Sequence, residues 1–331
     1  MRGRLFGAGW VAVLPFLAFG APLLANDSIA ETAAGGLELR TSADIDMVSE
    51  DLFVSAERVT VRYLFRNAAA RDVEALVAFP MPDRDLSLEQ FSDVAFPSGF
   101  RTLVDGKPVT MEVERKAVLK GADHTGLLGG LGIAVSGEEI RTALDRLPTA
   151  QQERLVKLGL AEVDEYDVGK GMERHLAPMW TVKESWFWRQ TFPAGRNLSV
   201  EHSYVPGTGG TVSTALADRE FRGSPEGIQM IADYCIDRDF LAGLDRMARA
   251  PGQDYPILPE QRIGYVLKTG ANWRSPIGSF RLVVDKGAPE NVVSFCGSGV
   301  RKIAPTQFEM RRSDWRPDAD LKVLIVGPPR G

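Results

Sequence analysis

One segment of the chain combines aromatic rings with charged groups in a pattern suited to ligand binding. Trp180, Trp186 and Trp188 lie at alternating positions, and Glu184 occupies the same register. Indole rings stack on sugars or pack against lipid groups, whereas a carboxylate on a buried face is costly without a partner. The candidate binding residues are therefore Trp180, Glu184, Trp186, Trp188 and, on the opposite strand face, Arg189. The simpler interpretation, which we favour, is that the rings fill a sheet core and that a bulge turns Glu184 outward.

The same carboxylate could take part in catalysis. Glu184 with Asp237 or Asp239 would supply an acid and a base for hydrolysis of an envelope polymer, although both aspartates fit better as caps of a helix. The sequence contains no Gly-x-Ser-x-Gly, no His-Glu-x-x-His and no phosphate-loop ending Gly-Lys-Ser/Thr. We assign no catalytic residue, no metal site and no cofactor. The balance favours a non-enzymatic protein, and a triad assembled from distant residues stays open.

Two further features have plain interpretations. His202 shares a predicted strand face with Val200 and Tyr204, which favours a hydrogen-bonded histidine at the edge of a core. The glycine-rich residues 126–132 predict a flexible loop. Such a loop could also act as a lid over a ligand site.

The chain contains two cysteines, Cys235 and Cys296. In an oxidising compartment such a pair favours one disulfide. Closing this loop would stabilise the fold by roughly 3–4 kcal/mol in the loop-entropy model. A redox or metal-binding pair is the alternative, but the Cys-x-x-Cys spacing is missing.

The first 25 residues resemble a secretory signal peptide. Arg2 and Arg4 precede an apolar stretch over residues 5–24, and Ala25 is suited to a cleavage site. An uncleaved membrane anchor is the alternative, which two prolines and internal glycines disfavour. We predict cleavage after Ala25, a periplasmic location and no later membrane span.

The charge of the chain argues against one class of partner. The formal net charge is −5. Removal of residues 1–25 takes away two arginines and no acid, which leaves 37 − 44 = −7. Nucleic-acid binding favours a strongly basic protein. We therefore expect no nucleic-acid partner, and instead an envelope ligand or protein partner that the sequence does not identify.

Alternating hydrophobic patterns predict a fold dominated by strands. Residues 59–65 and 73–79 alternate on either side of a turn and are expected to form an antiparallel pair. Asp105-Gly106 predicts a hairpin between residues 100–104 and 109–119. Further strands are expected at residues 180–192, 198–204, 261–269, 278–285, 291–296, 306–311 and 320–326.

Helices are expected as insertions among these strands. The pairs Ser136/Glu139 and Thr149/Gln152 have capping-box spacing and predict a short helical hairpin. A serine followed by a proline predicts one further helix at residues 225–249, with a break near Asp237.

The expected fold is therefore mainly β with α insertions (α+β), with antiparallel β-sandwich-like layers. We divide it into a signal peptide at 1–25, an N-terminal β region at 26–120, a Gly-rich loop with helical hairpin at 121–172, and a C-terminal β region at 173–331. The two β regions could share one domain.

Short motifs in a fixed order give the chain a resemblance to a known family. They are NDS at 26–28, AGGL at 34–37, SEDLFVS at 49–55, VRYLFRN at 61–67, AFPMP at 78–82, WRQTFPAG at 188–195, YCID at 234–237, FRLVVDKG at 280–287 and VSFCG at 293–297. Together they resemble the bacterial family catalogued as domain of unknown function 4424. The resemblance implies an exported bacterial protein of unassigned activity and supplies no catalytic residues.

Three functional hypotheses follow. The first is a non-enzymatic β module that binds an envelope ligand or partner. The second is the carboxylate-dependent hydrolase acting on an envelope polymer. The third is a purely structural partner of a membrane complex.

Overall fold

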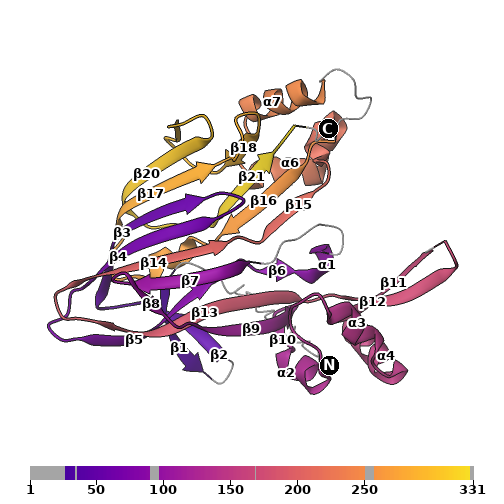
Figure 1. The fold of residues 1–331 in the computed structure, drawn as a ribbon, viewed down its shortest axis with the longest axis horizontal. Helices are drawn as coiled ribbons and strands as arrows, with labels where there is room; N and C mark the ends of the chain where they lie inside the picture. The colour runs from indigo at the N-terminus through magenta and orange to yellow at the C-terminus, as the bar shows by residue number, and fades with distance from the viewer. Residues whose placement is uncertain (1–26, 34–35, 90–96, 168, 250–256, 329–331) are drawn as a thin grey trace, which may run out of the picture.

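The computed structural model describes residues 27–33, 36–89, 97–167, 169–249 and 257–328. These residues form four β-sheets, and most of the helices are gathered at two places (Figure 1). The α+β, mainly β fold that the hydrophobic pattern predicts is confirmed. Among the described residues, no helix is both long and apolar enough to cross a membrane.

The first sheet has seven strands and carries the tryptophan-rich segment. Its order is β10 (Ala122–Asp123), β9 (Glu112–Leu119), β13 (Thr181–Phe192), β5 (Val73–Pro80), β1 (Ser28–Ala33) and β2 (Gly36–Arg40), and β6 (Arg84–Asp85) also pairs with β13. All these pairs are antiparallel. The tryptophan-rich strand β13 therefore lies inside the sheet, between β9 and β5.

The second sheet has eight strands and faces the first. Its order is β19 (Arg301–Lys302), β20 (Gln307–Trp315), β17 (Ile277–Asp285), β3 (Ile45–Val54), β4 (Val59–Asn67), β14 (Asn197–Val205), β7 (Ser98–Val104) and β8 (Lys107–Val109). Asp105 and Gly106, with φ angles of 46° and 74°, form the predicted turn between β7 and β8. The pair β3–β17 is parallel, whereas the other pairs in this sheet are antiparallel.

A four-stranded sheet with a helical cap completes the main body. Its order is β15 (Thr208–Thr211), β16 (Glu260–Tyr265), β21 (Leu321–Val326) and β18 (Val292–Phe295). The cap comprises η1 (Ala215–Ala217), α5 (Arg219–Gly223), α6 (Pro225–Asp233) and α7 (Arg238–Ala248), and the short helix η2 (Lys268–Asn272) follows β16. Leu216, Phe240 and Leu244 of the cap pack on Leu324 and Val326 of the sheet.

The remaining elements form an insertion at one end of β13 (Figure 1). They are α1 (Leu86–Glu89), α2 (Thr125–Gly130), α3 (Ile140–Asp145), α4 (Thr149–Leu158) and the separate hairpin β11 (Ala161–Asp167) with β12 (Met172–Pro178). The insertion has its own apolar cluster, which includes Leu128, Leu144, Leu155, Leu176 and Trp180.

The main core lies where the seven-, eight- and four-stranded sheets meet. Alternation along β4 buries Val59, Val61, Tyr63 and Phe65. Burial of such a side chain is worth about 1.5–3 kcal/mol. The core also takes residues from β5, β13, β16 and β21. Both predicted β regions therefore contribute to one apolar cluster.

The predicted pairing of residues 59–65 with 73–79 is wrong. β4 pairs with β3 and β14, whereas β5 pairs with β1 and β13 in the other sheet. Asn67 turns the chain between the layers, because its side-chain amide donates to the carbonyls of Arg71 and Phe192, both at 2.8 Å. Alternation places one face of each strand in the core, but it does not identify the hydrogen-bonded neighbour. Likewise, residues 112–119 of the predicted hairpin pair with β13 rather than β7.

The glycine-rich residues 126–132 contain a helix, α2, rather than only a loop. Leu128 is fully buried in the insertion core, so burial outweighs the low helix propensity of glycine here. Residues 161–167, placed in the helical insertion by the sequence, form strand β11.

The helix boundaries differ in part from the predicted ones. The residue before α3 is Glu139, without a side-chain cap, so the capping role predicted for Ser136 is wrong. Gln152 instead donates to the carbonyls of Asp145 and Leu147 at 2.9 and 3.1 Å. This arrangement ties α4 to the end of α3.

The predicted helix at 225–249 is two helices, α6 and α7, separated at residues 234–237. Cys235 has a φ angle of 50°, which is incompatible with a continuous helix. Asp237 then caps α7, since its carboxylate accepts the Phe240 amide at 2.8 Å.

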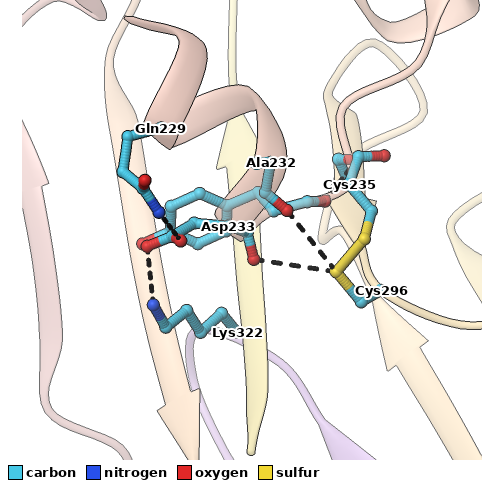
Figure 2. The surroundings of a disulfide bond; sticks show 8 residues. Gln229, Ala232, Asp233, Cys235, Cys296 and Lys322 are labelled. Carbon is cyan, nitrogen blue, oxygen red and sulfur yellow. Dashed lines mark hydrogen bonds and ion pairs between the residues drawn. A yellow bond between two sulfur atoms is a disulfide. The ribbon is translucent and has the colours of Figure 1, made fainter. Parts of the chain in front are cut away.

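A disulfide joins the helical cap to the four-stranded sheet (Figure 2). Cys235 follows α6 and Cys296 follows β18, and their Cα atoms are 5.0 Å apart. Lys322 of β21 holds the same helix end, because its Nζ lies 2.7 Å from the Asp233 carboxylate (Figure 2). The end of α6 is therefore fixed by a covalent bond and an ion pair.

Replacing both cysteines by alanine is expected to lower the free energy of unfolding by about 3–4 kcal/mol, because the unfolded chain loses a 61-residue cross-link. Denaturant unfolding measures the loss, and hydrogen exchange should show faster exchange in α6. A reductant should destabilise the wild-type protein equally and leave the double variant unchanged. If the wild-type protein and the double variant are equally stable in the absence of reductant, the disulfide does not have this role.

Candidate functional site

The tryptophans of the predicted binding segment are divided between two cores. Trp180 is fully buried in the insertion core, where its Nε1 donates to the Val135 carbonyl at 2.9 Å. Trp188 is 3% exposed in the main core, and its Nε1 donates to Gln190 at 3.1 Å. Neither ring offers a face to a ligand in this structure.

Trp186 differs from its neighbours because it is only half-buried, at the margin of the main core. Its ring stacks on Phe100 of β7, with centroids 5.0 Å apart and planes 12° apart. Phe100 in turn stacks on the buried Tyr204 at 5.4 Å. Val113 of β9, directly opposite Trp186 across the strand pair, is 37% exposed. We call Trp186, Phe100 and Val113 the aromatic ledge.

Glu184 stays on the core-facing side of β13, and the pairing of β13 with β9 and β5 runs without a register shift. The bulge considered from the sequence is therefore absent here. Its carboxylate lies 2.5 Å from Nε of Arg115, the residue directly opposite on β9, and accepts the Trp186 Nε1 hydrogen at 2.8 Å. The Glu184 side chain is 15% exposed and that of Arg115 is 40% exposed. A paired carboxylate and guanidinium thus border the ledge.

The other predicted site residues do not join this group. Arg189 is exposed on the opposite strand face. Asp237 caps α7 and Asp239 lies in the first turn of that helix. α7 lies over the four-stranded sheet, away from β13 (Figure 1). The structure therefore does not bring Glu184 together with either aspartate as an acid–base pair.

A buried polar cluster, which sequence reasoning missed in large part, lies behind the ledge. The imidazole of His202 on β14 is fully buried, as is the carboxylate of Asp27. His202 Nε2 lies 3.1 Å from both Asp27 oxygens, and Nδ1 lies 2.8 Å from the hydroxyl of Thr102 on β7. The expectation of a hydrogen-bonded histidine is confirmed, but His202 is deep in the core rather than at its edge.

Aromatic rings surround this histidine. Phe79, Phe100, Trp188 and Tyr63 have ring centroids 4.9, 5.4, 5.5 and 5.9 Å from that of His202. The ring of Phe100 therefore contacts both the ledge and the buried histidine.

Two tyrosines extend the polar network into the core. The hydroxyls of Tyr63 and Tyr265 are 2.8 Å apart, and that of Tyr265 lies 3.5 Å from the Glu50 carboxylate. Burial raises the pKa of both tyrosines well above the usual range, so both remain protonated donors. Burial also raises the pKa of Asp27, although the neighbouring His202 acts in the opposite direction.

Asp27, His202 and Thr102 have the order of an acid–base–nucleophile triad. Catalysis also requires that the nucleophile reach a substrate atom. Thr102 is 2% exposed and the other two side chains are fully buried, so no substrate reaches them in this structure. Their evident effect is to join the start of β1 to β14 and β7. The alternation around His202 signals a buried partner, but it does not reveal that the partner is Asp27, which is 175 residues away in sequence.

In the part of the chain that the structure describes, no three His, Cys, Asp or Glu side chains come together as ligands for a metal ion.

The Asp27→Asn variant is expected to change how stability depends on pH. An acid whose folded pKa is raised stabilises the fold most below its unfolded value of 3.8, and that contribution is lost as the pH rises through the folded pKa. The wild-type free energy of unfolding minus that of Asp27→Asn should therefore fall as the pH rises from 3.8. Denaturant unfolding of both proteins across the pH range measures this difference in the free energy of unfolding. A difference that stays constant or increases with pH would contradict a buried carboxyl group that retains its proton.

Comparison with known proteins identifies the family of this chain. A family model described as "Domain of unknown function (DUF4424)" matches residues 25–324. No curated protein matches the chain. Among solved structures, a "putative nutrient binding protein" from Legionella pneumophila subsp. pneumophila str. Philadelphia 1 has a TM-score of 0.43 and 16% sequence identity, with 90% of this chain and 72% of that chain covered. That likeness is too distant to assign a ligand. The family match spans nearly all of the sequence, and the chain belongs to the DUF4424 family.

Proposed function

We propose that this chain is a non-enzymatic binding protein of the bacterial periplasm that holds an envelope glycan on the aromatic ledge. The observation that carries the proposal is the half-buried Trp186–Phe100 stack beside the Glu184–Arg115 pair. A flat ring pair suits the apolar face of a sugar. The neighbouring charged groups suit its hydroxyls, because ligand sites combine apolar walls with a few well-placed polar groups.

The architecture around the ledge favours binding without large rearrangement. Trp186 is fixed on one side by Phe100 and at its Nε1 by the Glu184 carboxylate. The two strands that carry the ring and the ion pair are adjacent and regularly paired. Side chains that are already ordered lose little conformational freedom when a ligand arrives.

Periplasmic location is part of this proposal. The pattern of residues 1–25 supports export, and the Cys235–Cys296 disulfide suits an oxidising compartment. Amino-terminal sequencing of the protein recovered from periplasm should begin at Asn26. Intact precursor confined to the cytoplasm, with both thiols reduced, would contradict export.

The ligand proposal is tested with a defined probe, the tetramer of N-acetylglucosamine, by isothermal titration calorimetry. Trp186→Ala is expected to weaken binding at least tenfold, a loss of about 1.4 kcal/mol, because the stacking face disappears. Arg115→Gln should weaken it by a smaller factor. Tyr166→Ala removes another exposed ring, 44% exposed on β11, and serves as the matched control.

Failure of the wild-type protein to bind this probe, or equal binding by Trp186→Ala and Tyr166→Ala, would contradict a glycan site at the ledge. Far-UV circular dichroism and unfolding curves confirm that each variant is folded. If Trp186→Ala is unfolded, Arg115→Gln alone decides the result, since its side chain is more exposed.

A further inference from the structure

A second feature suited to binding lies at one end of the β3–β17 pair, and it shares no residue with the ledge. These neighbours are parallel, with Leu52 opposite Leu282 and Val54 opposite Val284. Their carboxyl ends therefore lie at the same edge of the sheet (Figure 1). The chain then turns back into β4 after β3, but continues toward β18 after β17. In open α/β sheets, connections that diverge from adjacent parallel strands leave a crevice in which ligands bind, and this single parallel pair has the same divergence.

A hollow is present at this edge. Its volume is about 580 Å³, and it is open to solvent. It lies in the size range of small-molecule sites. Its lining comes from the ends of both strands and from the connections that follow them: Phe53, Ser55, Glu57, Arg58, Asp285 and Gly287.

Arg58 supplies an exposed cation at this hollow. Its guanidinium lies over the ring of Phe53, 5.3 Å from the centroid. The turn that carries it is fixed by Ser55, whose hydroxyl accepts the amides of Glu57 and Arg58 at 3.2 and 3.1 Å. Across the described residues, the Arg58 side chain has no carboxylate within ion-pair distance. Its hydrogen-bond donors are therefore available to an anionic group.

Carboxylates provide the opposite charge in the same hollow. Asp285 accepts the Gly287 amide and the Gln307 side-chain amide, both at 2.9 Å. Burial raises the pKa of Asp285, but these hydrogen bonds lower it by more and hold it below its usual range. The carboxyl group is therefore ionised at neutral pH. Glu57 is exposed on the facing turn.

The adjacent Lys286 does not neutralise these acids. Its Nζ is turned away and donates to the carbonyls of Pro289 and Asn291. The hollow thus presents one guanidinium and two carboxylates beside an aromatic ring. This pattern matches a ligand that carries one charge of each sign.

We propose that this hollow binds a small zwitterion of the amino-acid or short-peptide class. Its carboxylate would pair with Arg58, its ammonium group would lie between Asp285 and Glu57, and its side chains would contact Phe53. Arg pairs with carboxylates through two parallel hydrogen bonds, which gives the site its orientation. This binding activity is independent of the glycan site proposed at the ledge.

The test is calorimetric titration of the full mature protein with the dipeptide Ala-Ala. Arg58→Gln is expected to lower its affinity at least tenfold, and Asp285→Asn or Glu57→Gln several-fold. Arg154→Gln, an exposed arginine on α4, is the matched control and should bind normally. Blocking either terminus of the peptide, as in N-acetyl-Ala-Ala or Ala-Ala-amide, should also lower its affinity for the wild-type protein at least tenfold.

Titrating the Arg58→Gln variant with the two blocked peptides shows which charge of the peptide pairs with Arg58. Arg58→Gln should have no further effect on the amide, which already lacks the carboxylate, but should still weaken the acetylated peptide. Absence of Ala-Ala binding at millimolar concentration, equal binding of the blocked peptides, or an unaffected Arg58→Gln variant would overturn the proposal. Trp186→Ala should bind Ala-Ala normally, so the failure of one site is distinguishable from the failure of the other.

Discussion

One long strand, β13, serves two hydrophobic cores, and the site depends on this constraint. Side chains at alternate positions point to the same face. Val182 on that face enters the insertion core, whereas Trp188 and Phe192 enter the main core. Between them, Glu184 and Trp186 lie in neither interior and remain partly exposed. The aromatic ledge and its charged border are therefore a consequence of the junction between the two cores.

The same junction explains how a carboxylate is tolerated on a core-facing position. Desolvation of an unpaired carboxylate would be costly. Glu184 instead receives hydrogen bonds from Arg115 and from the Trp186 indole. Behind it, His202 meets the same requirement through Asp27 and Thr102. Both polar groups are thus paired across strands, and the Asp27–His202 pair joins the start of β1 in the seven-stranded sheet to β14 in the eight-stranded sheet.

Alternation was sufficient to predict the β-rich fold and the burial of Trp188, since both depend on local pattern alone. It could not identify partners distant in sequence. Nothing near residue 73 indicates that β5 pairs with β13 rather than β4. Likewise, Asp27 and His202 are unremarkable until the fold brings them to 3.1 Å. Tertiary burial also made a helix of the glycine-rich segment at α2, against its intrinsic propensity. Trp186 could be named from sequence, but its exposure depends on where two cores end.

The exposure of Trp186 between two sealed cores is the central claim, and indole NMR tests it directly. The mature protein has five tryptophans, because the sixth, Trp10, lies in the segment that we expect to be removed. Their side-chain signals are assigned by single Trp→Phe variants, and a soluble paramagnetic chelate is added. The Trp186 signal should broaden strongly, while those of Trp180 and Trp188 should remain sharp. If Trp186 is as protected as Trp188, or if Trp188 broadens equally, the ledge does not exist as described.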